Sequence, residues 1–224
     1  MKFYIGIDEA GRGPIIGPMT FGGVLADEKQ IKILKELGVK DSKLLPHPKR
    51  EFLSVQIKKN VLACTTLAIS PRDIDKSLAE KINLNQLEAK KAAEIINFLK
   101  KRVDEVEIIV DCPSTNIISW RNYLLQHIKN PEKIKLRCEH KADLNHTIVG
   151  AASILAKVLR ENEVEKIQKN IDQDIGSGYP SDPTTIEFLK KHSLKFKDSG
   201  IFRKSWQTWK DLHPPKSQKK LGDF

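Results

Sequence analysis

Four acidic side chains stand where a strand would end and a substrate could reach them. Asp8 and Glu9 follow directly on an apolar run at 3–7, Asp111 follows the run 105–110, and Asp143 lies shortly beyond a third run at 134–138. Carboxylates without a companion cluster of Cys or His are the oxygen ligands that suit Mg²⁺ or Mn²⁺. Two such ions about 4 Å apart would activate a water and stabilise the leaving oxygen of a phosphodiester.

Two of these acids also have an ordinary structural explanation. Asp143 precedes a helix of small residues and can serve as its N-cap, a role that contributes ~1 kcal/mol. Asp111 precedes a Cys-Pro pair and can form a turn. The adjacent pair Asp8 and Glu9 is harder to explain in this way. Because side chains alternate along a strand, the two acids face opposite sides of the sheet, and at least one needs a partner in or near the core.

A glycine-rich turn with one arginine, Gly11-Arg12-Gly13, follows the first two acids at once. It fits neither the dinucleotide-binding nor the P-loop pattern. Glycines tolerate positive φ and let the backbone approach a ligand closely. Arg12 can add a charge-assisted contact to a phosphate. The sequence therefore places an acidic, metal-ready edge beside a turn suited to a phosphate or a sugar.

Two further loops offer ligand contacts. The segment 39–43 carries two ammonium groups, one of them on Lys43, and a hydroxyl; it can contact phosphate or form a solvated charged turn. Tyr179 lies in a loop between a glycine and a proline, and its ring can stack on a sugar or base or anchor the loop to the body.

Two histidines, His140 and His146, flank Asp143, but their spacing does not support a His-Asp-His metal site. We place both behind the site or on the surface, and proton transfer by His140 stays open. The aromatic residues Phe202, Trp206 and Trp209 are expected to seat a terminal helix.

Hydrophobic periodicity predicts a chain of alternating strands and helices. Strands are expected at 3–8, 19–26, 61–69, 105–110 and 134–138, and helices at 28–37, 48–59, 85–102, 115–128, 145–168, 184–192 and 203–212. The regular alternation in the second half indicates parallel pairing with right-handed crossovers, whereas the short links of the first half permit antiparallel pairing. In such a mixed sheet, ligands gather at the carboxyl ends of the parallel strands.

Composition narrows the class of protein. The chain has 224 residues, 39% hydrophobic and 30% charged, which is typical of a soluble globular protein with one full domain and an appendage, or two small domains. A net charge of +10 favours a polyanionic partner such as nucleic acid, although a lysine-rich surface alone would also explain it. Three cysteines without a C-x-x-C pair argue against a disulfide framework or a zinc knuckle.

The N-terminus and the apolar runs of the chain indicate its place in the cell. The N-terminus is too short and too acidic for a signal peptide, and no apolar run approaches the ~18 residues needed to cross a bilayer. We expect a cytoplasmic protein without membrane association, acting as a monomer.

Taken in order, the motifs resemble those of ribonuclease HII. They are I-G-I-D-E-A-G-R-G-P at 5–14, D-S-K at 41–43, V-D-C-P at 110–113, K-A-D at 141–143, A-A-S-I-L-A-K at 151–157, S-G-Y-P-S-D-P at 177–183 and R-K-S-W at 203–206. The first block is highly specific, and the shorter blocks support it by their order. The resemblance spans most of the chain and is closest to the archaeal members.

The resemblance implies an α/β fold with an RNase H-like mixed five-stranded sheet flanked by helices and a helical C-terminal extension. We divide the chain into a catalytic domain at 1–160 and an extension at 161–224 that contributes substrate contacts. The implied activity is endonucleolytic cleavage of RNA in RNA–DNA hybrids and on the 5′ side of ribonucleotides embedded in duplex DNA. One or two Mg²⁺ or Mn²⁺ ions would assist, and the products would carry 3′-hydroxyl and 5′-phosphate ends.

Particular residues take family roles by their motif. The catalytic, metal-binding positions of the family correspond to Asp8, Glu9, Asp111 and Asp143. The turn that contacts the ribose 2′-hydroxyl through its backbone corresponds to Gly11, Arg12 and Gly13. Tyr179 corresponds to the tyrosine that stacks on the deoxyribose next to the ribonucleotide, and Lys43 lies in a phosphate-contacting segment. Cys112 follows the third acid, and no function is assigned to it. The tail at 218–224 loosely resembles a clamp-binding peptide, so a sliding clamp is a candidate partner.

The sequence is less compatible with three other kinds of protein. A nucleic-acid-binding protein of the same fold without catalysis is disfavoured because all four acids are present. An actin- or hexokinase-type phosphotransferase normally has hydroxyl residues after the strand Asp, where this chain has Glu9 and Ala10. Ribonuclease HIII shares the chemistry but usually has an extra N-terminal domain, for which a chain that starts on the catalytic strand leaves no room.

Overall fold

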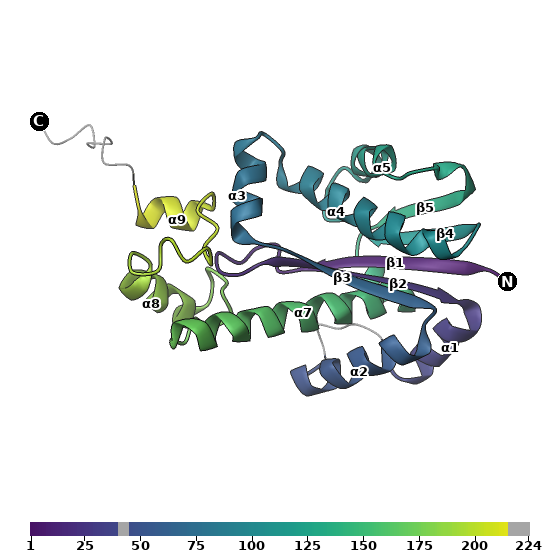
Figure 1. The fold of residues 1–224 in the computed structure, drawn as a ribbon, viewed down its shortest axis with the longest axis horizontal. Helices are drawn as coiled ribbons and strands as arrows, with labels where there is room; N and C mark the ends of the chain where they lie inside the picture. Colours follow the sequence, from purple (N-terminus) through teal and green to yellow (C-terminus); the bar gives the residue numbers. More distant parts are fainter. Residues whose placement is uncertain (40–44, 215–224) are drawn as a thin grey trace, which may run out of the picture.

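The computed structural model describes residues 1–39 and 45–214. In this part of the chain the strands form one five-stranded sheet in the order β3-β2-β1-β4-β5 (Figure 1). The strands are β1 (Phe3–Ala10), β2 (Met19–Asp27), β3 (Ala63–Ile69), β4 (Val106–Asp111) and β5 (Ile134–Glu139). β1 pairs antiparallel with β2, and β2 with β3, whereas β1, β4 and β5 run parallel. The prediction of a mixed sheet is confirmed.

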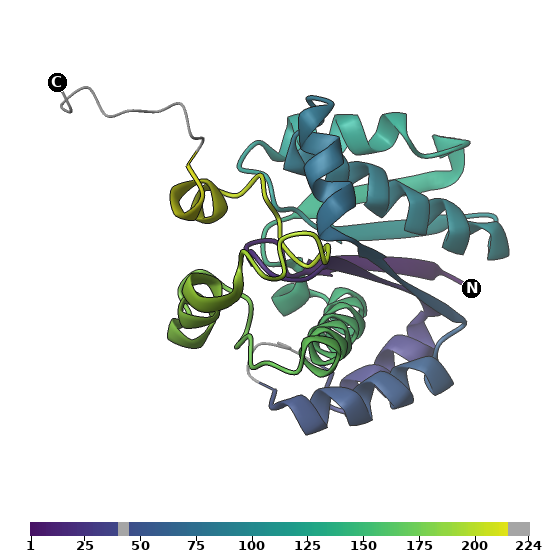
Figure 2. The same ribbon diagram turned by 60° about the vertical axis from the view of Figure 1, so that its left-hand side comes forward.

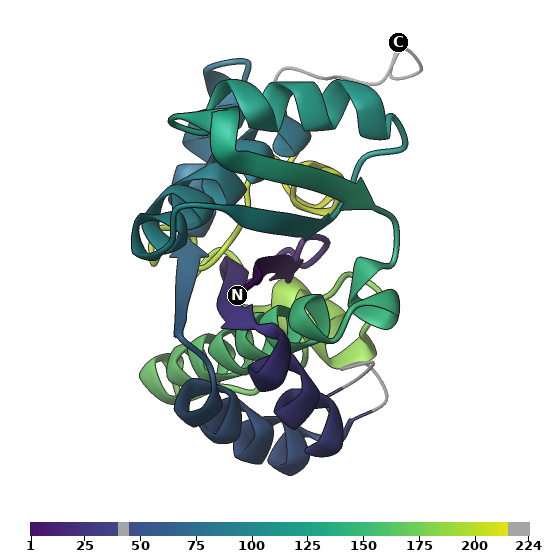
Figure 3. The ribbon, with the colours of Figure 1, turned by 90° about the vertical axis from the view of Figure 1, so that its right-hand side faces the viewer.

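Helices cover both faces of the sheet (Figures 1 and 3). One face carries α3 (Pro71–Ala79), α4 (Leu84–Leu99) and α5 (Ile117–Gln126), and the other carries α1 (Glu28–Glu36), α2 (His47–Asn60) and α7 (Thr147–Ile171). Short helical turns occur at Lys100–Arg102, at Pro131–Lys133 and at α6 (Ala142–Asn145), which directly precedes α7. The last helices, α8 (Pro183–His192) and α9 (Gln207–Leu212), lie beyond one end of the sheet.

Capping residues explain where several helices begin. Asp27 accepts a hydrogen bond from the backbone of Gln30, whose side chain bonds back to the Asp27 backbone N–H, and the same reciprocal pair joins Asn83 to Gln86. Each pair satisfies two backbone donors that the first helical turn leaves open. These caps set the starts of α1 and α4, and the start of α4 matters for the site described below.

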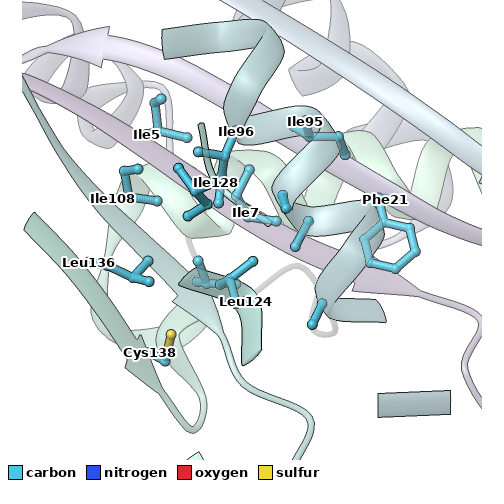
Figure 4. Packing of buried hydrophobic residues seen from close by; sticks show 14 of the residues in the cluster. Ile5, Ile7, Phe21, Ile95, Ile96, Ile108, Leu124, Ile128, Leu136 and Cys138 are labelled. Carbon is cyan, nitrogen blue, oxygen red and sulfur yellow. The ribbon is translucent and has the colours of Figure 1, made fainter. Parts of the chain in front are cut away.

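Two hydrophobic layers enclose the sheet. On the α4 side, Ile5 and Ile7 of β1 pack with Ile95 and Ile96 of α4 and with Ile108 of β4 (Figure 4). The layer on the α7 side includes Val24, Ile109, Ala151 and Ala152, and Tyr4 of β1 packs against it. Because alternate residues of β1 face opposite layers, Asp8 lies on the α7 side and Glu9 on the α4 side.

Three local expectations need correction. Helix α3 was not expected; Ser70 caps its first turn and Pro71 follows at the first helical position. The helix expected over 203–212 begins only at Gln207, because the backbone N–H of Arg203 pairs with the carbonyl oxygen of Ile15 and Trp206 is extended. Asp143 lies inside α6, and α7 begins after His146, so the alternative in which Asp143 caps the long helix is wrong.

The C-terminal segment, which comprises residues 172–214, packs against the loop that follows β1 (Figure 2). Ile15 and Ile16 of that loop share a third hydrophobic cluster with Ile175, Phe188 and Phe202. The backbone N–H of Ile15 donates to the carbonyl oxygen of Gly178 over 2.9 Å. Residue 160, where the sequence suggested a domain boundary, lies within α7, and the division into 1–160 and 161–224 stays a prediction.

The helices of the described residues include none with the length and apolar character needed to cross a membrane. Cytoplasmic location and a monomeric state stay predictions.

Candidate active site

The predicted site residues meet in one cleft of about 720 Å³. Its lining includes all four acids, Asp8, Glu9, Asp111 and Asp143, together with the glycine turn 11–13 and Tyr179. The acids come from the end of β1, the end of β4 and α6, which the parallel pairing of β1 with β4 brings to the same edge of the sheet. Lys43 lies outside the described residues.

Asp8 is held between strand and helix in a nearly solvent-free position. It is 4% exposed, its Oδ1 accepts the backbone N–H of Glu9 over 2.8 Å, and the hydroxyl of Ser153 on α7 also bonds to it. Burial raises the pKa of Asp8 to about 7; the negative charges of Asp111 and Asp143 act in the same direction, and the Ser153 hydrogen bond opposes them. The three acids therefore interact electrostatically.

Glu9 is the second member of this charge cluster. Burial raises its pKa well above the ordinary value, and the charges of Asp8, Glu88 and Asp111 raise it further, against the influence of Arg12. Asp111, the last residue of β4, accepts the backbone N–H of Ala142 through Oδ1 over 2.8 Å. That bond ties α6, and with it Asp143, to the end of β4.

The donor set fits a hard divalent cation. The carboxylates of this cleft, of which Asp8 and Asp143 are nearly buried, repel one another, and a bound cation would favour their charged forms and lower their pKa values. Within residues 1–39 and 45–214, no group of three His, Cys, Asp or Glu side chains is already gathered as a metal cluster. The fit to Mg²⁺ or Mn²⁺ thus depends on the chemistry of the donors, which are carboxylate oxygens.

The glycine turn is in contact with Arg160 of α7 and with Arg203 and Trp206 of the C-terminal segment. Gly11 has φ +76°, and a Cβ there would overlap the side chain of Arg160. Arg203, fully buried, donates to the carbonyl oxygens of Gly11 over 2.6 Å, Arg12 over 2.8 Å and Gly17 over 3.1 Å. Trp206 Nε1 donates to the carbonyl oxygen of Gly13 over 3.1 Å, so this residue contacts the turn as well as seating the terminal segment.

A second buried arginine, Arg160 of α7, links the turn to Tyr179. It donates to the carbonyl oxygens of Pro18 over 2.8 Å and of Ile16 over 3.1 Å. Its guanidinium lies 5.9 Å from the centre of the Tyr179 ring, and Tyr179 is 39% exposed. The ring is thus anchored at one face and accessible to a ligand.

Arg12 is held by α4. Its Nε donates to Glu88 Oε1 over 2.7 Å, and its Nη2 donates to Asn85 Oδ1 over 2.7 Å. Glu88 is 1% exposed, and burial raises its pKa to about 7, with Arg12 opposing that rise. In the structure the Arg12 guanidinium anchors the turn, while the side chain is 42% exposed in the cleft, and its contact with a phosphate stays a prediction.

The part of the cleft lined by α2 and α7 carries charges of both signs. His47 Nδ1 lies 2.6 Å from Glu161 Oε2, and Arg50 forms an ion pair with the same carboxylate. Lys157 and Glu165 also line this part of the cleft.

The histidines near Asp143 lie outside the cleft lining, as expected. His140 Nδ1 is 3.0 Å from the carbonyl oxygen of Cys112, and His146 Nε2 is 2.9 Å from Glu139 Oε2. The Cys112 thiol lies 3.6 Å from the carbonyl oxygen of Ser114.

Sequence reasoning missed five side chains that hold the site. They are Asn85, Glu88, Ser153, Arg160 and Arg203. One of them had a detectable signal: Glu88 precedes Ala92 by four residues and Ile95 by seven, and it therefore falls on the inward stripe of its helix.

Comparison with known proteins places the chain among nucleases. The model of the family described as Ribonuclease HII matches residues 5–209. The ribonuclease HII of Methanococcus maripaludis strain C6 is 42% identical over 212 residues, covering 94% of this chain and 87% of the relative. That of Methanocaldococcus jannaschii is 40% identical over 227 residues, covering 97% of each.

Solved structures agree with these matches. The ribonuclease H2 from Pyrococcus horikoshii OT3 superposes with a TM-score of 0.84 at 36% identity, covering 94% of this chain and 96% of that one. A chain of the PCNA:RNase HII complex from Archaeoglobus fulgidus gives 0.80 at 36% identity, covering 99% and 100%. Bst-RNase HIII in complex with Mn²⁺ gives 0.79 at 21% identity, covering 94% and 69%, a likeness of fold alone.

Proposed function

We propose that this chain, which belongs to the ribonuclease HII family and is a ribonuclease H type endonuclease acting on RNA–DNA hybrids, also cuts duplex DNA on the 5′ side of an embedded ribonucleotide. The family match decides against a phosphotransferase and against a binding protein without catalysis. The observation that carries the proposal is the single cleft in which four carboxylates lie beside the glycine turn.

In this proposal the four acids hold one or two divalent cations. Bound Mg²⁺ or Mn²⁺ supplies the Lewis acidity that activates water and stabilises the departing 3′ oxygen. Asp8 and Asp143, which are nearly buried, would provide ligands on the α7 side, with Glu9 on the α4 side and Asp111 at the end of β4. The Mn²⁺ complex of Bst-RNase HIII, a protein of the same fold, supports this choice of ion.

The glycine turn would distinguish ribose from deoxyribose. The 2′-hydroxyl is the group that separates RNA from DNA at one nucleotide. Arg203 and Trp206 engage the carbonyl oxygens of Gly11 and Gly13, and we therefore assign the contact with the 2′-hydroxyl to the backbone N–H groups of the turn. Backbone groups contact the sugar without regard to the base, so we expect cleavage at any ribonucleotide.

Tyr179 would stack on the deoxyribose next to the ribonucleotide, since its ring is accessible and anchored at the cleft. A phosphate contact by Lys43 stays a prediction. Binding of a sliding clamp by the tail at 218–224, which lies outside the described residues, is supported by the Archaeoglobus fulgidus complex of PCNA with RNase HII.

The test is cleavage of duplex DNA that contains one ribonucleotide, with the cut mapped to the nucleotide. We expect the wild-type protein with Mg²⁺ or Mn²⁺ to cut on the 5′ side and leave 3′-hydroxyl and 5′-phosphate ends. Asp111→Asn should abolish cleavage and largely retain binding, because it removes a charged ligand and keeps the side-chain shape.

The matched control is Asp104→Asn, which changes an exposed acid outside the cleft and should leave the rate unchanged. Retained turnover in Asp111→Asn would refute the metal assignment. A cut at any other position would refute the proposed specificity.

A further inference from the structure

We propose that Glu88 of α4 is a positioning residue for the glycine turn: by holding Arg12 and balancing the charge of Arg12 and Arg203, it keeps the turn in the form that distinguishes ribose from deoxyribose. The inference rests on the proposed sugar-contacting role of the turn. It concerns a side chain that lies outside the lining of the cleft.

Arg12 is anchored by two neighbouring side chains of α4. Glu88 and Asn85 are three residues apart on α4, so both project from the same side of the helix, and each accepts one hydrogen bond of 2.7 Å from the Arg12 guanidinium. The backbone carbonyl of Asn85 in turn accepts Trp120 Nε1 of α5 over 3.0 Å. Arg12 is therefore held at two points by a helix end that is itself tied to its neighbour.

Glu88 also supplies negative charge near Arg203. The hydrogen bonds that Arg203 makes to the turn all end on backbone carbonyl oxygens, so none of them neutralises its charge. Glu88 interacts electrostatically with both Arg12 and Arg203. A buried guanidinium such as that of Arg203 is costly without a nearby negative charge. Asp75 of α3 and Glu88 of α4 both offset the charge of Arg203, and Glu88 also pairs with Arg12.

Glu88 occupies a position in the core. It lies on the inward stripe of α4 with Ala92, Ile95 and Leu99, where an apolar side chain would ordinarily stand. Its Oε2 is buried and has no hydrogen-bond partner among the described residues. A buried carboxylate that uses only one oxygen is a poor source of stability compared with an apolar residue. Its contact with Arg12 accounts for its presence.

The test measures discrimination between sugars. Glu88→Gln is made in the full chain on the Asp111→Asn background, so that Mg²⁺ can be present without cleavage. The probes are a DNA duplex with one ribonucleotide and the all-DNA duplex of the same sequence. We expect the affinity for the ribonucleotide duplex to fall about tenfold, while the affinity for all-DNA duplex stays within about twofold. Melting temperatures are recorded for each variant.

Glu94→Gln is the matched control, since Glu94 lies on the exposed side of the same helix in an ion pair with Lys91. It should leave both affinities unchanged. Equal losses on both duplexes, or unchanged discrimination in Glu88→Gln, would overturn the inference. Equal binding of the two duplexes by the background protein itself would overturn the sugar-contacting turn, and this inference with it.

A double-variant cycle tests whether Glu88 acts through the turn arginine. Arg12→Ala with Glu88→Gln should lose less discrimination than the two single losses multiplied together, because the contact between the two residues is already gone and only the effect of Glu88 on Arg203 remains. Losses that multiply would show that Glu88 acts independently and would overturn the inference. Asn85→Ala, which removes the other acceptor of Arg12 and keeps the Glu88 charge, should lower discrimination about threefold; no change there counts against the anchor.

Discussion

At the scale of single residues, the carboxylates of Asp8, Asp111 and Asp143 repel one another in the folded protein. Burial raises the pKa of Asp8 from its ordinary 3.8 to about 7. Between these two pH values the folded protein holds a proton that the unfolded chain releases, so the metal-free protein loses stability as the pH rises from about 4 to 7. The same property prepares the cleft for a cation, because a positive ion removes the repulsion.

This property predicts that Asp8→Asn stabilises the metal-free protein at pH 8 and has little effect at pH 4. A pKa rise of this size corresponds to as much as about 4 kcal/mol, and each kcal/mol shifts the melting temperature by roughly 2–4 °C in a chain of this length. Calorimetry in EDTA at the two pH values measures the difference, with Asp104→Asn as the exposed control. A variant that melts no higher than wild type at pH 8 would contradict the prediction.

At the scale of elements, the depth to which α7 packs on the sheet sets the cleft. Ser153, Lys157 and Arg160 all reach the cleft from α7. The helix approaches closely because small residues face the strands, and a Cβ at Gly22 of β2 would overlap the carbonyl oxygen of Ala152. Since that obstacle is backbone, α7 as a whole would have to move.

Gly22→Ala is therefore predicted to destabilise the protein by about 2–3 kcal/mol and to lower activity in the fraction that folds. Urea unfolding measures the stability, and cleavage of an RNA–DNA hybrid measures the activity. Gly38→Ala serves for comparison, because no atom lies within 4 Å of a Cβ there and only its positive φ opposes the change, at about 1 kcal/mol. Equal effects at the two positions would show that α7 can shift without harm.

At the scale of the whole molecule, a net charge of +10 and a cleft lined by the end of the sheet, α7 and Tyr179 suit a polyanionic duplex. Acidic ligands at the centre are surrounded by a basic protein. The charge favours association with the phosphate backbone, and the cleft provides the chemistry at one bond.

Binding to duplex DNA should therefore weaken steeply with salt. Four phosphate contacts would give a slope near −3.6 in log affinity against log salt, or a loss of roughly 100-fold between about 50 and 200 mM. Lys157→Gln, a change inside the cleft, should reduce the slope by about one, whereas Lys2→Gln, where Lys2 pairs with Glu107 away from the cleft, should not change it. A response that is flat with salt would contradict electrostatic capture.

Local pattern and chain topology were enough to predict much of this protein. Apolar runs located the strands, the alternation of strand and helix indicated their parallel pairing, and strand ends located Asp8, Glu9 and Asp111 at one edge. These features are predictable because side-chain alternation and right-handed crossovers follow from backbone geometry. Asp143 was ambiguous, since a helix cap and a ligand have the same sequence pattern.

Only the tertiary structure decided what holds the turn. Arg203 meets Gly11 across 192 residues of chain, Arg160 meets Pro18 across 142, and Glu88 meets Arg12 across 76. No periodicity or spacing encodes such pairs, because they depend on which surfaces the packed helices bring together. The sequence by itself determined the positions of the acids and of the glycine turn along the chain. The packing of the helices determined which buried charges hold the turn, since a buried guanidinium or carboxylate is tolerated only where the fold supplies its partner.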